Sequence, residues 1–129
     1  MSENILLTPF NIGKETIKNR FVMGPMGGAK FFDYRGSYTQ EGIDFYVERA
    51  KGGFGMIVTG ALGVDTKVDR FDPVNSMSPL FAPGQFMNSA NTLNERVNAY
   101  GTKMIAEISL LVGRNYPTFK APSAVECYN

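Results

Sequence analysis

The chain has 129 residues, with 13 basic and 12 acidic side chains, no histidine and a single cysteine, Cys127. A net charge of +1 argues against an electrostatic surface for nucleic acid, and no apolar run approaches the roughly 18 residues of a membrane span. One cysteine fits a reducing cytoplasm, so we expect a cytoplasmic protein, and no Cys/His cluster suggests a metal site. A hydrophobic fraction of 43% predicts a globular chain.

The first predicted elements are two short extended pieces, at about residues 5–8 and 16–18, which a turn joins into a hairpin. A strand follows at about residues 21–24 and leads into a loop rich in glycine and aromatic residues. Thr39 then suits the N-cap of a helix. This helix has one apolar face and ends at a glycine pair, Gly52-Gly53. The apolar positions are Ile43, Tyr46, Val47 and Ala50.

The second half of the chain repeats this alternation. Residues 56–59 are apolar on both faces, as a strand covered by helices requires. Residues 61–84 show no clear period, and a second helix is predicted at 85–100, followed by a strand at 103–109. Strands alternating with helices predict an α/β fold with a parallel sheet. The helix stripe comprises Phe86, Ala90, Leu93, Val97 and Tyr100.

Two segments carry a resemblance to a known family. Residues 19–28 read NRFVMGPMGG, and residues 48–60 read ERAKGGFGMIVTG. In order and spacing the pair resembles the start of the Old Yellow Enzyme family of FMN-dependent ene-reductases, in particular its 2,4-dienoyl-CoA reductase-like and bile-acid-inducible branch. The resemblance implies that residues 1–129 are the N-terminal portion of a (β/α)8 TIM barrel, comprising the hairpin, about three strands and two helices. A complete barrel takes roughly 250 residues, so we expect a fragment, a truncated product or one piece of an assembly.

The resemblance also implies a cofactor site at the carboxyl ends of the strands. Pro25, Met26 and Gly27 would lie against the flavin ring of FMN. Gly60 would pack beside the ring and offer its amide. The third strand of such enzymes usually carries a glutamine at the pyrimidine edge of the ring, and Glu107 stands at this position. NAD(P)H would be the reductant.

Glu107 departs from the family pattern in a way that matters for the chemistry. An ionised carboxylate offers only acceptors, whereas an amide offers a donor as well. It would also repel the negative charge of reduced flavin. The alternative is that Glu107 simply pairs with a nearby lysine or arginine. No catalytic residue is assigned, and the only phenols near the site are those of Tyr34 and Tyr38.

The expected function is that of an FMN-dependent NAD(P)H oxidoreductase acting on the activated C=C bond of an enone, enoate or enoyl thioester. Two alternatives stay open: a non-catalytic remnant or assembly subunit without the cofactor, and another phosphate-binding barrel without flavin. The chain alone is expected to be inactive, because family barrels hold the flavin phosphate with loops after later strands. Open sheet edges template pairing, so we expect self-association or docking with a chain that supplies the missing strands.

Overall fold

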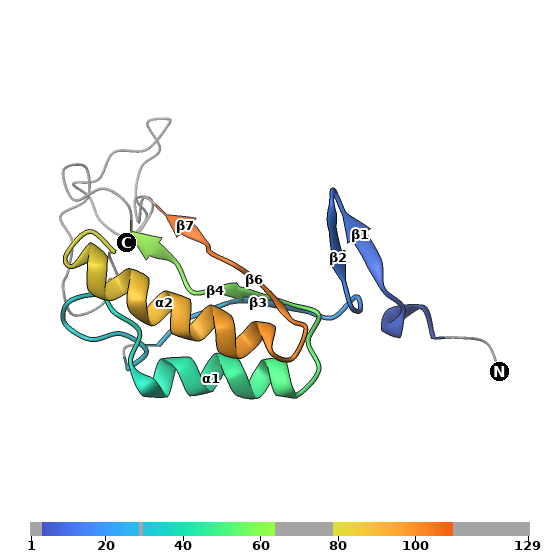
Figure 1. Cartoon of the computed structure of the whole chain (residues 1–129), viewed down its shortest axis with the longest axis horizontal. Helices are drawn as coiled ribbons and strands as arrows, with labels where there is room; N and C mark the ends of the chain where they lie inside the picture. Colours follow the sequence, from blue (N-terminus) through green and yellow to red (C-terminus); the bar gives the residue numbers. More distant parts are fainter. Residues whose placement is uncertain (1–3, 29, 64–78, 110–129) are drawn as a thin grey trace, which may run out of the picture.

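The computed structural model describes residues 4–28, 30–63 and 79–109 (Figure 1). Residues 64–78 and Cys127, on which parts of the sequence interpretation fall, lie outside these ranges. The described elements, in chain order, are a 3-10 helix η1 (Ile5–Leu7), β1 (Phe10–Ile12), β2 (Glu15–Ile17), β3 (Val22–Met26), α1 (Gln40–Lys51), β4 (Met56–Thr59), β5 (Leu62–Gly63), α2 (Pro83–Asn98), β6 (Lys103–Ile105) and β7 (Ile108–Ser109).

The centre of the fold is a parallel sheet in the order β3-β4-β6. Helices α1 and α2 lie side by side along one face of this sheet, and the β1–β2 hairpin stands apart near the N-terminus (Figure 1). The predicted α/β alternation and the partial barrel architecture are therefore confirmed. No described helix covers the opposite face, where Val22 and Ile105 are exposed.

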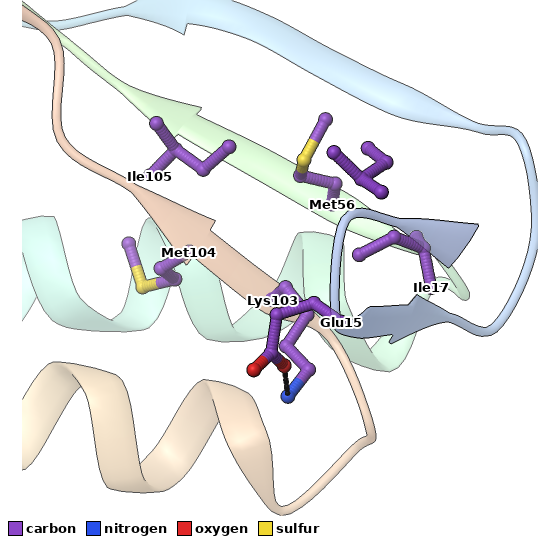
Figure 2. Close-up of a pocket in the computed structure, with 7 residues that line it drawn as sticks. Glu15, Ile17, Met56, Lys103, Met104 and Ile105 are labelled. Atoms are coloured by element: carbon purple, nitrogen blue, oxygen red, sulfur yellow. Dashed lines mark ion pairs between the residues drawn. The ribbon is translucent and has the colours of Figure 1, made fainter. Parts of the chain in front are cut away.

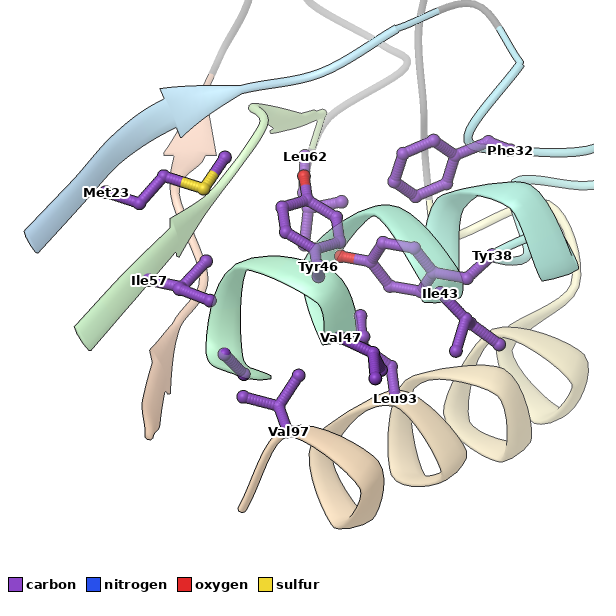
Figure 3. Packing of buried hydrophobic residues seen from close by; sticks show 11 residues of the cluster. Met23, Phe32, Tyr38, Ile43, Tyr46, Val47, Ile57, Leu62, Leu93 and Val97 are labelled. Carbon is purple, nitrogen blue, oxygen red and sulfur yellow. The ribbon is translucent and has the colours of Figure 1, made fainter. Parts of the chain in front are cut away.

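Helix α1 forms where its sequence predicts it. The Thr39 hydroxyl accepts a hydrogen bond from the Gly42 amide at 3.1 Å and caps the first turn. At the other end Gly53 adopts a positive φ of 103°, which glycine tolerates without strain. All four predicted apolar positions of this helix are buried in the core (Figure 3).

Helix α2 contributes Leu93 and Val97 to the same core (Figure 3). Phe86 and Ala90 are partly buried against it. The predicted stripe was wrong at Tyr100, which is 43% exposed. The helix ends at Asn98, so Tyr100 lies in the turn that follows and no longer shares the helical face.

Two further expectations about strands were wrong. Residues 5–7 form η1 instead of an extended piece, because Asn4 Oδ1 accepts the Leu6 amide at 3.1 Å and closes a local turn. The single strand expected at residues 103–109 is interrupted at residues 106–107. There the Glu107 amide donates to Thr59 Oγ1, and β7 pairs with β5 instead of continuing the ladder with β4.

Strand β3 carries a bulge close to its carboxyl end. Met23 pairs with Ile57 and Met26 pairs with Thr59, so three steps along β3 match two steps along β4. A bulge of this kind leaves one residue unpaired and bends the strand. Pro25 lies inside the irregular stretch and lacks the N–H that a regular ladder would use.

The amino ends of the strands are joined by polar side chains. Asn19 Nδ2 donates to the Gly53 carbonyl at 2.8 Å, and Thr102 Oγ1 donates to the Phe54 carbonyl at 2.6 Å. The hairpin joins this end through an ion pair of 2.8 Å between Lys103 Nζ and Glu15 Oε2. Beside that ion pair lies a mainly apolar pocket of about 310 Å³, lined by Ile12, Glu15, Ile17, Met56, Lys103, Met104 and Ile105 (Figure 2).

Candidate functional site

Three of the five predicted site residues meet at the carboxyl ends of β3 and β4. Met26 is the last residue of β3, Gly27 follows it, and Gly60 follows β4. A Cβ atom on Gly60 would lie 2.8 Å from Gly27 Cα and 3.1 Å from the Met26 carbonyl oxygen. Glycine at position 60 thus lets the two strand ends touch through their backbones.

Pro25, Met26 and Gly27 are exposed, whereas Gly60 is buried. Met26, the last residue of β3, retains 51% of its accessible surface. Gly24, just before Pro25, also borders open space, because a Cβ atom there would meet nothing within 4 Å. We refer to Pro25, Met26, Gly27 and Gly60 as the strand-end surface.

The Tyr46 hydroxyl of helix α1 connects the same two strand ends. It donates to the Met26 carbonyl oxygen at 2.6 Å and accepts from the Gly60 amide at 3.0 Å. The amide that the family resemblance assigns to flavin is therefore already hydrogen-bonded within the chain. Tyr46 is completely buried, and burial raises the pKa of its phenol, while the Gly60 hydrogen bond lowers it.

The Thr59 hydroxyl makes the equivalent connection between β4 and the segment after β6. It accepts from the Glu107 amide at 3.2 Å and donates to the Gly60 carbonyl oxygen at 3.0 Å. Nearby, the Leu62 amide donates to the Glu107 carbonyl oxygen at 2.9 Å. The backbone of Glu107 is thus fixed on both sides.

The Glu107 side chain is half-buried, and within the described ranges its carboxylate takes part in no ion pair or hydrogen bond. The alternative interpretation, pairing with a neighbouring lysine or arginine, therefore gains no support from these residues. The structure brings the Glu107 backbone to the end of β4 through Thr59. The direction of its carboxylate toward a ligand remains a prediction.

The two phenols named from the sequence lie in different surroundings. Tyr34 is 78% exposed, with the Arg35 guanidinium 5.1 Å from its ring centre. Tyr38 is buried against Phe32 and Phe86, with ring centres 4.4 Å and 5.8 Å away. Burial, and then the neighbouring phenol of Tyr46, raise the pKa of Tyr38 well above its usual value, with a smaller opposing contribution from a hydrogen bond with Thr59. Tyr38 therefore belongs to the core.

Sequence reasoning missed Tyr46 and Thr59 as residues of this site. The sequence pattern predicts only an apolar helix face at Tyr46 and only the end of a strand at Thr59. A usable signal was present, because a buried phenol or hydroxyl usually finds a hydrogen-bond partner. Among the four apolar positions of α1, only Tyr46 carries such a group.

The described part of the chain contains no group of three His, Cys, Asp or Glu side chains that could hold a metal ion. None of its helices combines the length and the apolar character needed to cross a membrane.

The sequence model of the NADH:flavin oxidoreductase / NADH oxidase family matches residues 5–126. Cinnamate reductase of Clostridium sporogenes is 41% identical over 110 residues, which are 85% of this chain and 16% of that enzyme. NADH oxidase of Thermoanaerobacter brockii is 32% identical, over 95% of this chain and 19% of that enzyme. The chain thus spans less than a fifth of the length of these two relatives.

Solved structures agree with this match. A 2-naphthoyl-CoA reductase in complex with 2-naphthoyl-CoA is similar with a TM-score of 0.69 and 27% identity, over 81% of this chain and 15% of that one. The old yellow enzyme of Trypanosoma cruzi gives a TM-score of 0.67 at 19% identity, over 81% of this chain and 26% of that one. At that identity the second similarity concerns the fold alone, which is that of a TIM barrel.

Proposed function

The chain belongs to the NADH:flavin oxidoreductase / NADH oxidase family, and we propose that its strand-end surface forms part of the FMN site of an ene-reductase. The family uses FMN as cofactor and NAD(P)H as reductant. The resemblance to Old Yellow Enzymes that the sequence suggests is confirmed by the family match. The activity, the substrate and the role of each residue in this chain are the proposal.

The observation that carries the proposal is the backbone contact between Gly60 and Gly27 beside an exposed Met26. A flat aromatic ring needs a surface with few side chains, so that backbone and ring can approach closely. Two glycines in contact supply such a surface, and Pro25 and Met26 add apolar atoms beside it. The described residues therefore fit the ring of FMN, and its phosphate is expected to bind loops after later strands of a complete barrel.

The chain's own groups would bind and orient the ring. FMN, when bound, supplies redox chemistry between NAD(P)H and a double bond. Met26 and Pro25 would cover one part of the ring and exclude water from it. The Glu107 carboxylate would place a negative charge close to the pyrimidine edge, where it disfavours a further negative charge.

The substrate class follows from the relatives' names. One relative is a cinnamate reductase and one similar structure is a 2-naphthoyl-CoA reductase, so one is named for an unsaturated carboxylate and the other for an aromatic thioester. We propose that this protein likewise reduces an activated C=C bond next to a carboxylate or thioester carbonyl.

A cytoplasmic location remains a prediction that rests on the single Cys127.

A second candidate is a non-catalytic assembly subunit. One observation favours it: Val22, Ile105 and Ile108 are exposed on strands of the described region. Apolar strand residues without a covering layer favour association with another chain. We propose self-association, or docking with a chain that supplies further barrel strands. Light scattering that shows a stable monomer at micromolar concentration would contradict this.

Titration of the 129-residue chain with FMN tests the flavin proposal. Contacts to the ring alone should give weak binding, with Kd on the order of 0.1–1 mM, and should shift the NMR signals of Met26, Gly27 and Gly60. Met26→Ala should weaken binding about threefold or more, because it removes an apolar contact. Met87→Ala is a matched control, since Met87 is 53% exposed but lies on α2. Equal effects of the two substitutions, or no shifts at residues 26, 27 and 60, would contradict the proposed site.

A further inference from the structure

We propose that the hydroxyl groups of Tyr46 and Thr59 are positioning groups for the flavin ring. They set the backbone geometry of three consecutive strand ends, at Met26, Gly60 and Glu107, without touching the ligand themselves. The inference rests on the proposed function for its ligand. Its structural basis, four hydrogen bonds between two buried hydroxyls and backbone atoms, is independent of that function.

Tyr46 controls the spacing between β3 and β4. Its hydroxyl holds the Met26 carbonyl at 2.6 Å and the Gly60 amide at 3.0 Å, so both strand ends are fixed to one atom of helix α1. This link lies beyond the bulge, where the regular ladder between the two strands has already been disturbed. A buried hydroxyl without competing water is well suited to replace the lost ladder bonds.

Thr59 controls the approach of the third strand end. Its single proton is donated to the Gly60 carbonyl oxygen, and its lone pairs accept the Glu107 amide. Ladder pairing between β4 and β6 stops at Val58 and Ile105. The Thr59 hydroxyl therefore holds Glu107 at the point where the sheet itself no longer does.

The position of these two hydroxyls separates them from ordinary core hydrogen bonds. Both belong to buried side chains, and both bind backbone atoms of residues in the strand-end surface, Tyr46 at Met26 and Gly60 and Thr59 at Gly60. A small displacement of Gly60 relative to Gly27 would change the flat area that the ring needs, because the two residues are already in contact. Removing a hydroxyl should thus alter ring binding as well as stability.

Amide hydrogen exchange in the 129-residue chain tests whether the two hydroxyls hold the strand ends. Tyr46→Phe keeps the buried ring and removes only the hydroxyl, and Thr59→Val is close to isosteric. Loss of one hydrogen bond should speed exchange about threefold to tenfold: at Gly60 in Tyr46→Phe, and at Glu107 in Thr59→Val. The mid-strand Ile57 amide serves as internal reference, and Thr59→Ser should restore protection of Glu107. Unchanged exchange at both amides relative to Ile57 would overturn the proposal.

FMN titration of the same variants tests whether the two hydroxyls affect ring binding. Tyr46→Phe and Thr59→Val should each raise the Kd for FMN about threefold or more, and Thr59→Ser should stay within twofold of the parent chain. Tyr100→Phe is the control, because Tyr100 is exposed and lies in the turn after α2, at the amino ends of the strands. Faster exchange with unchanged FMN affinity would overturn the positioning role and leave the hydroxyls structural. Expected exchange without any FMN binding by the parent chain would instead refute the proposed function, and with it the flavin role of the hydroxyls.

Discussion

Side-chain hydrogen bonds to backbone atoms join the strands at both ends of the parallel sheet, but the two ends differ in what lies next to these bonds. At the amino ends, Asn19 and Thr102 reach the carbonyls of Gly53 and Phe54, and the hairpin adds an ion pair. At the carboxyl ends, Tyr46 and Thr59 make comparable bonds. The hairpin is linked to the amino ends by its ion pair, whereas among the described residues three members of the strand-end surface, Pro25, Met26 and Gly27, are exposed.

This difference separates stability from function within one small sheet. Polar side chains that bind neighbouring backbone stabilise both ends, because buried carbonyls and amides need partners. At the carboxyl ends these bonds lie beside the exposed residues Pro25, Met26 and Gly27, which we propose to contact the ring. Substitutions at the amino ends should therefore change stability alone, and those at the carboxyl ends should change ligand binding too.

The largest effect is expected for Gly55→Ala at the amino ends. The new Cβ would lie 2.5 Å from the Asn19 carbonyl oxygen and 2.6 Å from Asn19 Oδ1, so the free energy of unfolding should fall by about 3 kcal/mol. Gly60→Ala should cost about 1–2 kcal/mol, because its nearest neighbour, Gly27, is exposed and can move. Urea denaturation measures both changes.

Gly24→Ala is the matched control for these glycine substitutions. A Cβ atom at Gly24 would meet nothing within 4 Å, so the free energy of unfolding should change by less than about 1 kcal/mol. If Gly60→Ala destabilised the chain more than Gly55→Ala, the carboxyl ends would be the more rigid of the two, contrary to the comparison.

Thr102→Val should give the next largest effect. The Thr102 hydroxyl is fully buried, donates to the Phe54 carbonyl and accepts from Lys18 Nζ at 3.1 Å. Its removal should lower the free energy of unfolding by about 1–3 kcal/mol and leave FMN affinity unchanged, unlike Thr59→Val. Thr92→Val, at an exposed helix position, is the control. A weaker FMN affinity in Thr102→Val would remove the distinction between the two ends.

Alkaline pH should lower the free energy of unfolding through two buried phenols, those of Tyr38 and Tyr46. Burial raises the folded-state pKa of Tyr38 and Tyr46 above their unfolded value. Their contribution to stability is complete below the unfolded pKa of about 10 and is lost as the pH rises toward the folded values, by up to about 1.4 kcal/mol per pH unit for each group. Chemical denaturation from pH 9 to 12 should show this fall.

Tyr38→Phe should flatten that profile, and Tyr34→Phe should not, because Tyr34 is exposed. A parent chain whose stability stays constant from pH 10 to 12 would show that the two phenols ionise without unfolding.

Glu107→Gln should have the smallest effect on stability, below about 0.5 kcal/mol, because the Glu107 backbone carries its described hydrogen bonds. In a flavin-loaded form, removal of the charge should raise the reduction potential. A partly screened interaction of about 1–2 kcal/mol corresponds to roughly 20–45 mV for two electrons. Spectroscopic titration against a redox dye measures this, and a potential unchanged within about 5 mV would place the carboxylate away from the ring.

Sequence patterns predicted the elements better than their ends. The N-cap at Thr39, the buried face of α1 and the bounds of β4 follow from local chemistry and were confirmed. The break after β6 was missed because it depends on a contact with Thr59, 48 residues away in the chain. Periodicity contains no information about such a partner.

The motifs that carry the family resemblance divide between the two ends. Asn19 and Gly55 have a structural role at the amino ends, where Asn19 packs against Gly55 and donates a hydrogen bond to the Gly53 carbonyl. Met26, Gly27 and Gly60 lie together because parallel strands end on the same side, and their contact with flavin stays a prediction. Tyr46 could not be separated from core residues by its spacing, since one buried side chain both packs and donates a hydrogen bond.

The bulge in β3 has a consequence for changes in chain length. Three steps from Met23 to Met26 are matched with two steps on β4, so deletion of Gly24 would allow a regular ladder. Because side chains alternate along a strand, Met26 would then share the face of Met23 and turn toward the helices. The strand would still end in Pro25, Met26 and Gly27, but the Met26 side chain would no longer be exposed. An insertion and deletion scan of residues 23–27 would therefore detect a constraint on residue number that substitutions at the same positions leave hidden.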